Sequence, residues 1–355
     1  MKIHNPSALE AHEALIFPGM RLGEYLMRCK EEFPLIYQRL NHDFVNSALM
    51  AGYVENLGTF PAHFESEDEG GRGDTYRQSQ MRHPLARATG IQQLFDLFAD
   101  PGGQLHPAMV ILDLLGGNGT LTRAARCIYA SEQTPTIITS DLSAEMVRDA
   151  LSKGLPAIRQ AAQKLLFADQ TVDGTLFSYG THHIPPESRM STFAEALRVL
   201  KPGAQIVVQD FEEDSPTARW YSELLDKYTT TGHDCIHFTR EDMSHLLKGA
   251  GFEDVRVLDV YDPFVLEAAT AEEARKNMLD HVTNLFGLQV LLPDAPEDKD
   301  YDRLEKVLEP FTTFTSAELP RDRPTVQRLT LTPTVNGFRA ELPRVALVAT
   351  GRRPA

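Results

Sequence analysis

A glycine-rich segment and an isolated aspartate downstream carry residue types that bind a nucleoside-like ligand. An apolar run ends at Asp113 and predicts a buried strand, whose carboxyl end would place this carboxylate near a ligand's amino group. The turn that opens the next helix holds Gly116, Gly117, Asn118 and Gly119. Glycines there let the backbone approach a ligand closely. Asp141, followed by Leu142, ends the next predicted strand and is placed to accept hydrogen bonds from ribose hydroxyls.

The spacing of these glycines excludes one class of nucleotide site. Dinucleotide-binding turns carry a GxGxxG pattern that cradles a pyrophosphate. Here the glycines fall at positions 116, 117 and 119, with none two or three residues later. The turn therefore fits a nucleoside ligand without a pyrophosphate group.

Side chains that can move a proton lie at two further strand ends. His182 and His183 follow the strand expected at 174–179, and we interpret them as candidate general bases. The alternative is that the pair orients backbone or packs at the strand exit. Asp210 ends the strand expected at 205–211, where it is a second candidate catalytic group or a helix cap. Tyr179 is expected to contact the ligand or to flank a positive centre with its ring.

A separate set of residues has metal-binding side chains but irregular spacing. His233 and Asp234 lie in a loop after the strand at 205–211, and His281 follows much later. Together these residues form a candidate site for a divalent metal, with solvent-exposed loop histidines as the alternative.

A basic cluster precedes the strand that ends at Asp113. It consists of Arg77, Arg82, His83 and Arg87. We expect these residues either to clamp a carboxylate or to form an exposed helix face.

The elements that position these residues alternate between strand and helix from about residue 109. This alternation predicts a doubly wound, mostly parallel α/β sheet, with 106–262 as its core. Residues 1–105 are expected to form a helical cap, lid or dimerisation region. Residues 263–335 break the alternation and read as an insertion for substrate or lid, and 336–355 as the final core strand.

The composition of the chain indicates which kinds of partner it can bind and in which cellular compartment it works. The chain has 355 residues and a formal net charge of -15, which disfavours nucleic acid and an anionic membrane surface. Three widely spaced cysteines and the lack of a signal-peptide pattern indicate a cytoplasmic protein. We expect a small-molecule substrate, and a homodimer is the oligomer that the N-terminal helices suggest.

The segment from about 109 to 211 resembles a class I S-adenosylmethionine-dependent methyltransferase of the ubiquinone/menaquinone C-methyltransferase type. Asp113, Gly117 and Gly119 match the family's Asp-x-Gly-x-Gly-x-Gly turn, in which Leu115 replaces the first glycine. Further matches in order are Asp141, the stretch at 165–173, the strand exit at 179–184 and the turn at 196–203. The acid that usually meets adenine is replaced near Gln160 and Ala161, with Gln160 or Gln163 as the substitute acceptor.

This resemblance implies a Rossmann-like fold, S-adenosylmethionine as cofactor, and methyl transfer to carbon or oxygen of a small metabolite. The loop histidines loosely resemble those of 2-oxo-acid C-methyltransferases, which makes a 2-oxo acid in specialised metabolism one expected acceptor. Two alternatives remain at this point. The same core can consume S-adenosylmethionine without methylating, as in an intramolecular cyclase or aminocarboxypropyl transfer that releases methylthioadenosine, or it can bind the cofactor without catalysis.

Overall fold

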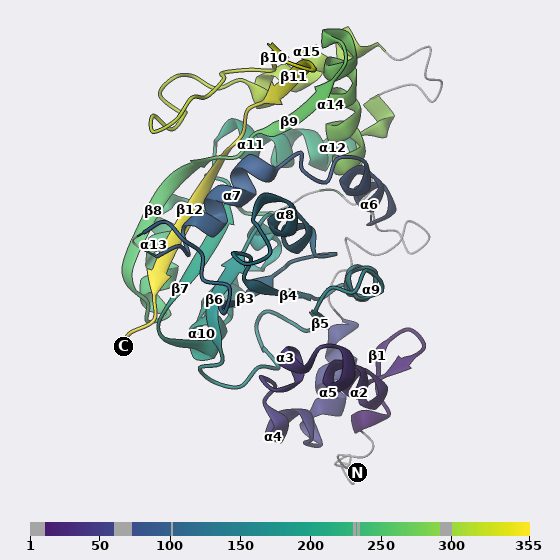
Figure 1. The fold of residues 1–355 in the computed structure, drawn as a ribbon, viewed down its shortest axis with the longest axis vertical. Helices are drawn as coiled ribbons and strands as arrows, with labels where there is room; N and C mark the ends of the chain where they lie inside the picture. The colour runs from purple at the N-terminus through teal and green to yellow at the C-terminus, as the bar shows by residue number, and fades with distance from the viewer. Residues whose placement is uncertain (1–10, 60–72, 101, 230–231, 233–234, 292–299) are drawn as a thin grey trace.

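The computed structural model describes residues 11–59, 73–100, 102–229, 232, 235–291 and 300–355. At its centre is a seven-stranded sheet in the order β5-β4-β3-β6-β7-β12-β8 (Figure 1). The strands are β3 (Val110–Leu114), β4 (Thr136–Asp141), β5 (Ala157–Arg159), β6 (Val172–Phe177), β7 (Leu200–Asp210), β8 (Glu253–Tyr261) and β12 (Val345–Arg352). β12 pairs antiparallel with β7 and β8, and the remaining pairs are parallel. The predicted Rossmann-like, doubly wound fold is therefore confirmed.

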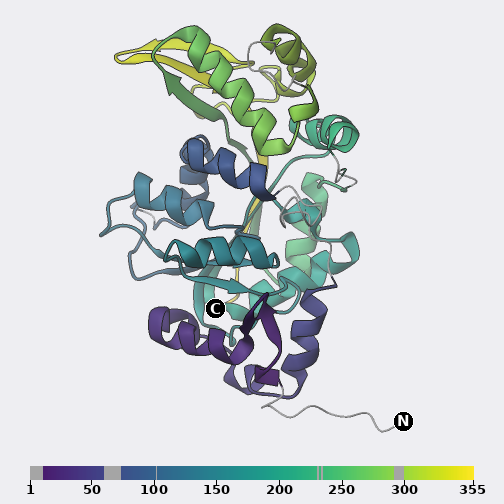
Figure 2. The same cartoon turned by 90° about the vertical axis from the view of Figure 1, so that its right-hand side faces the viewer.

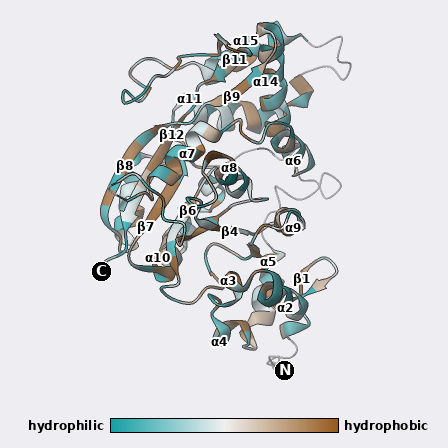
Figure 3. Cartoon of the chain, viewed as in Figure 1, coloured by the Kyte–Doolittle hydropathy of each residue, from teal (hydrophilic) through white to brown (hydrophobic). Residues whose placement is uncertain are grey.

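Helices cover both faces of this sheet because its strands bury alternate side chains on opposite sides. Leu112 packs into one hydrophobic core, whereas its neighbour Ile111 packs into the other. The first core includes α9 (Ala144–Ser152), α10 (Pro186–Val199) and α13 (Arg240–Gly249). The second includes α7 (Ala88–Asp96), α8 (Thr120–Ile128), α11 (Pro216–Arg219) and η3 (Trp220–Leu225). In Figure 3 the strands of this sheet carry much of the hydrophobic colour.

The residues before the core divide into two groups that lie apart (Figure 2). The first group consists of β1 (Leu15–Phe17), β2 (Met20–Arg21), α2 (Leu22–Glu32), α3 (Pro34–Tyr37), α4 (His42–Val45) and α5 (Leu49–Leu57). It joins the sheet at β5, where the Tyr25 hydroxyl donates to the Ala157 carbonyl at 2.6 Å. The second group starts with α6 (Gly73–Arg82), which packs against α14 (Ala271–Phe286). A lid or dimerisation role for these residues stays a prediction.

A smaller antiparallel sheet follows β8 and has the order β10-β11-β9. Its elements and their neighbours are β9 (Phe264–Ala268), α14, η4 (Gln289–Leu291), α15 (Tyr301–Thr312), β10 (Thr330–Thr334) and β11 (Gly337–Leu342). The segment 336–355, expected as the final core strand, thus contains two strands, β11 in the small sheet and β12 in the large one. Pro343 stands between them, where its missing N–H ends the first pairing.

Two further observations concern the chain as a whole. Across the residues that the structure describes, no helix is both long and apolar enough to span a bilayer. Cys29, Cys127 and Cys235 are all free thiols.

Candidate functional site

The turn between β3 and α8 has the left-handed backbone that a close ligand approach requires. Leu115, Gly117 and Gly119 have φ values of 62°, 56° and 75°. Leu115 therefore has a left-handed conformation that glycine adopts readily but a leucine adopts at a steric cost of about 1–2 kcal/mol. The positive φ of Gly119 favours glycine where helix α8 begins, and a Cβ there would also lie 2.6 Å from Cδ1 of Leu155.

Asp113 lies directly beneath this turn. A Cβ at Gly116 would lie 2.6 Å from its Oδ2 atom, so the carboxyl group fills the space that a side chain would need. Asp113 is fully buried, and neither carboxyl oxygen has a hydrogen-bond partner among the described residues. Burial, followed by the nearby charge of Asp141, raises its pKa well above the usual value. The side chain supports the turn from below and does not line the cavity described next.

A cavity of about 440 Å³ opens over the carboxyl ends of β3, β4 and β6. Its lining includes Leu115, Gly116, Gly117, Ser140, Asp141, Leu142, Ser143, Ala162, Gln163, Ser178, Tyr179, Gly180 and His183. Strands β3 and β6 are neighbours in the sheet. After β3 the chain adds β4 and β5 on one side, and after β6 it adds β7 on the other side. Ligands of doubly wound folds bind at this kind of reversal.

Asp141 is held rigidly at the cavity wall. Its Oδ2 accepts a hydrogen bond from the Gly117 amide at 2.8 Å, and its Oδ1 accepts one from the Ser143 amide at 2.9 Å. These bonds join the glycine turn to the start of α9. A carboxylate can accept several hydrogen bonds, and the sequence position predicts that Asp141 accepts the hydroxyls of a ribose. Leu142 lines the same cavity.

Asn118 faces away from the cavity and serves the fold. Its amide donates to Asp149 at 2.8 Å, and its oxygen accepts from Thr120 at 3.0 Å. Neither Asn118 nor Gly119 lines the cavity, so any effect of these two residues on a ligand acts through the shape of the turn.

Of the residues expected in place of the acid that usually contacts adenine, some line the cavity and others lie behind its wall. Gln160 lines the cavity, but its Oε1 accepts from the Leu166 amide and its Nε2 donates to Ser140, at 2.8 Å and 2.9 Å. Ala161 lies behind the wall and donates its amide to the Tyr53 hydroxyl at 2.9 Å. Its neighbours Ala162 and Gln163 line the cavity instead.

Tyr179 lies on the wall within a buried polar network. Its hydroxyl donates to Oδ1 of Asp262 at 3.0 Å, and the guanidinium carbon of Arg87 lies 4.3 Å from its ring centroid. Arg344 donates to both the side chain and the carbonyl of Asp262. Asp262 and Arg344 were not identified as site residues from the sequence. The available signal was a charged residue beginning the otherwise apolar segment at 344–349.

Of the predicted basic cluster, Arg87 alone lines the cavity. Arg77 pairs with Asp74 and with Glu145, Arg82 is exposed, and the His83 ring packs edge-on against His281. The cluster therefore disperses in three dimensions, and one of its members becomes part of the site.

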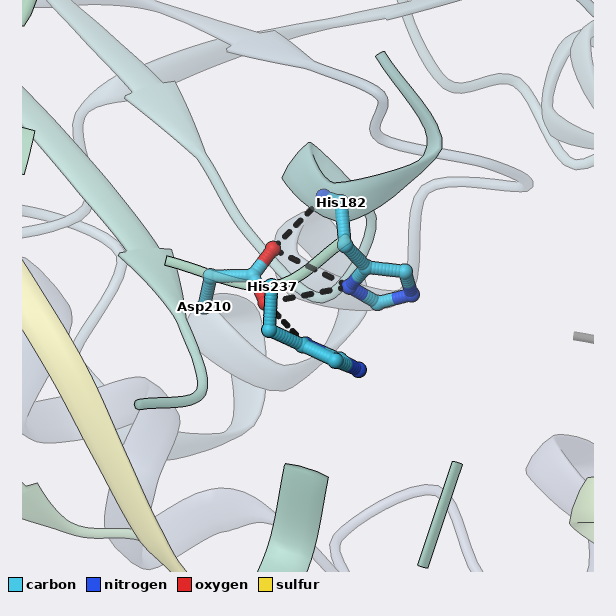
Figure 4. A group of neighbouring side chains, drawn as sticks. All are labelled: His182, Asp210 and His237. Carbon is cyan, nitrogen blue, oxygen red and sulfur yellow. Dashed lines mark hydrogen bonds and ion pairs between the residues drawn. The ribbon is translucent and has the colours of Figure 1, made fainter. Parts of the chain in front are cut away.

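The two histidines after β6 have different environments. His183 lines the cavity, whereas His182 is buried beside Asp210. Nδ1 of His182 and Nδ1 of His237 lie 3.0 Å and 3.1 Å from the Asp210 carboxylate (Figure 4). Burial alone would raise the pKa of Asp210, but the two histidines outweigh it and hold that pKa well below the usual range. Asp210 thus positions the loop that carries His183 and does not itself line the cavity.

Potential metal ligands converge in one group among the described residues. The group is His182, Asp210 and His237, whose ligand atoms lie within 4.8 Å of one another. Figure 4 shows both imidazoles turned toward the same carboxylate. Two histidines and a carboxylate are a donor set that suits a divalent transition metal. His233 and Asp234 lie outside the described residues, and Nδ1 of His281 lies 2.9 Å from the Ser79 hydroxyl, so the metal site predicted there remains a prediction.

The strand order, the glycine turn and the acid after the second strand together define a nucleoside-binding domain of the doubly wound α/β class. A family model described as a methyltransferase domain matches residues 111–203. Residues 111–203 therefore form a class I S-adenosylmethionine-dependent methyltransferase domain, and the predicted resemblance is confirmed.

Two curated proteins and one solved structure illustrate what this chain is similar to. A ubiquinone/menaquinone biosynthesis C-methyltransferase of Bordetella avium is 28% identical over 180 residues, which cover 45% of this chain and 67% of that protein. The enzyme of the same name from Brucella anthropi is 23% identical over 235 residues, covering 58% and 88%. A structure of a Haemonchus contortus phosphoethanolamine N-methyltransferase, in complex with phosphomonomethylethanolamine and S-adenosylhomocysteine, is similar with a TM-score of 0.45 and 16% identity, covering 75% of this chain and 52% of that chain.

Proposed function

We propose that this protein transfers the methyl group of S-adenosylmethionine to a carbon or oxygen atom of a small-molecule metabolite. The observation that carries the proposal is the single cavity that joins the glycine turn, Asp141 and His183. A volume of about 440 Å³ lies in the lower half of the range for small-molecule sites, which favours a small acceptor. The net charge of -15 disfavours a nucleic-acid acceptor.

The residues on the wall fit the cofactor in chemical type. Asp141 would accept the ribose hydroxyls, and the backbone of Gly116 and Gly117 would lie against the nucleoside. Leu142, Ala162 and Gln163 would surround the adenine, with the Gln163 side chain as its polar partner. When bound, S-adenosylmethionine supplies an electrophilic methyl group on a sulfonium.

The chain contributes alignment and a place for the acceptor's proton. Positioning the nucleophile against the methyl group provides much of the rate enhancement in such a transfer. His183 is the candidate base on the cavity wall, where it would take the proton that the acceptor's nucleophilic atom loses. His182 and Asp210 are positioning residues, because their contacts fix the turn from which His183 projects.

For the acceptor we propose a 2-oxo acid of specialised metabolism, made and used in the cytoplasm. A divalent metal would acidify the carbon beside its carbonyl group. Two donor sets could hold such a metal: the sequence-predicted His233, Asp234 and His281, and the described group His182, Asp210 and His237, which lies next to His183 but does not line the cavity. Support for an acidic acceptor comes from Arg87, which is buried and lies on the cavity wall.

The purified protein incubated with S-adenosylmethionine and a panel of 2-oxo acids, with and without added Fe²⁺, Mn²⁺ or Zn²⁺, tests this proposal. Mass spectrometry should detect S-adenosylhomocysteine and a product heavier by one methylene group, both lost in Asp141→Ala. A control without acceptor identifies self-consumption of the cofactor. Methylthioadenosine in place of S-adenosylhomocysteine would contradict methyl transfer and select the cyclase or aminocarboxypropyl alternative.

A further inference from the structure

Arg87 is a buried cation with unused hydrogen-bonding capacity on the cavity wall. It immediately precedes α7 and is 5% exposed, yet it lines the cavity. Its guanidinium makes one hydrogen bond within the described chain, from Nη2 to the Tyr76 hydroxyl at 3.3 Å. A guanidinium carries five N–H donors in a planar fork, so most of this group's donors remain for a ligand.

The charges around Arg87 do not balance. Asp262 is the buried carboxylate of this network, and it is already bonded to Arg344 and to the Tyr179 hydroxyl. Two buried guanidinium groups therefore share one carboxylate, which leaves one positive charge in excess. An uncompensated buried charge is costly, so an anionic ligand that neutralised the charge of Arg87 would be bound favourably.

A second arginine on the cavity wall, unlike Arg87, uses its hydrogen-bond donors within the protein. Arg159 also lines the cavity, but it donates to the carbonyls of Leu142 and Ile16 at 2.9 Å and 2.6 Å. Its guanidinium therefore braces the backbone. Arg87 has no comparable carbonyl contacts within the described chain.

The position of Arg87 is fixed on both sides. The Ala86 carbonyl accepts from the Val265 amide at 2.8 Å, and Gly90 in the first turn of α7 lies so close to Asp262 that a Cβ would collide with it. The Tyr179 ring lies against the guanidinium. The site is therefore built in advance of binding.

We propose that Arg87 is the carboxylate-binding residue of this cavity, with its guanidinium fork engaging both oxygens of a ligand carboxylate above the Tyr179 ring. This role of Arg87 rests on the proposed function, because that function determines which ligands enter the cavity. Two sources carry this chemistry in the same cavity, the carboxylate of S-adenosylmethionine and the carboxylate of an oxo-acid acceptor. The geometry that selects a planar anion is the same for either source.

Isothermal titration calorimetry distinguishes the two sources without any turnover. The first arm compares S-adenosylmethionine with decarboxylated S-adenosylmethionine, which lacks the carboxylate. The second compares 3-methyl-2-oxobutanoate with the neutral ketone 3-methyl-2-butanone on protein saturated with S-adenosylhomocysteine. In one of these arms the wild type should prefer the carboxylate ligand by about tenfold or more, and Arg87→Gln should abolish the preference.

Matched variants separate recognition from folding. Arg82→Gln removes an exposed arginine five residues away and should bind every ligand as the wild type does. Arg87→Lys keeps the charge without the fork and should retain a part of the preference. Equal binding of acid and neutral ligand by the wild type in both arms would overturn the proposal, even if Arg87→Gln failed to fold. A preference that survives in Arg87→Gln would also overturn it. Because these are binding measurements, they fail independently of the methyl-transfer assay.

Discussion

At the scale of single residues, two aspartates near the same turn have opposite environments. Asp141 is on the cavity wall and accepts hydrogen bonds from the backbone amides of Gly117 and Ser143. Asp113 is sealed beneath Gly116 without a hydrogen-bond partner in the described chain, and its pKa is raised by burial and by Asp141. The sequence indicates that both positions carry acids, but it does not show that one of them lies outside the cavity.

The raised pKa of Asp113 leads to a prediction about how the stability of the protein varies with pH. A carboxyl group whose folded pKa lies above its unfolded value costs stability as the pH rises through that interval, because ionisation then favours the unfolded chain. Asp113→Asn removes this cost and keeps the shape. The ligand-free variant should therefore melt at a higher temperature than the wild type at pH 8, and the difference should shrink to nothing near pH 4. Scanning calorimetry across this range measures it, and a difference that does not vary with pH would contradict the account.

At the scale of elements, the β3–α8 turn shows how a replaced glycine is tolerated. Leu115 and Tyr179 both have positive φ, at 62° and 60°, and both line the cavity. Non-glycine residues in this conformation are uncommon and gather at functional sites. The glycine motif departs from the family pattern at Leu115, yet the backbone there has a positive φ and the side chain forms part of the cavity wall.

Substitution at Leu115 tests this strain directly. Leu115→Gly and Leu115→Ala remove nearly the same side-chain contacts but differ in their freedom to adopt positive φ. At ordinary positions alanine is the more stable of the two by roughly 0.5–1 kcal/mol. Here we expect the glycine variant to be more stable than the alanine variant by about 1 kcal/mol in urea unfolding. The ordinary order, with alanine ahead, would show that the turn is unstrained.

At the scale of the whole molecule, the sequence predicts the core well and the surroundings of the cavity less well. Strand and helix periodicity is local, so the predicted doubly wound sheet is confirmed, and the glycine turn, Asp141 and Tyr179 meet at one cavity. The Tyr179 network depends on Asp262 and Arg344, which are distant in sequence and meet because β12 inserts between β7 and β8. The members of the basic cluster are close in sequence but are divided between α6 and the start of α7. No local pattern encodes such long-range pairings.

The central claim is that this cavity binds S-adenosylmethionine through Asp141. Isothermal titration of S-adenosylhomocysteine into the wild type, Asp141→Asn and Asp169→Asn tests it most directly, since Asp169 is an acid that does not line the cavity. We predict one site per chain in the wild type and in Asp169→Asn, and an affinity lower by about tenfold or more in Asp141→Asn. Binding that is absent from the wild type, or unchanged in Asp141→Asn, would contradict the account.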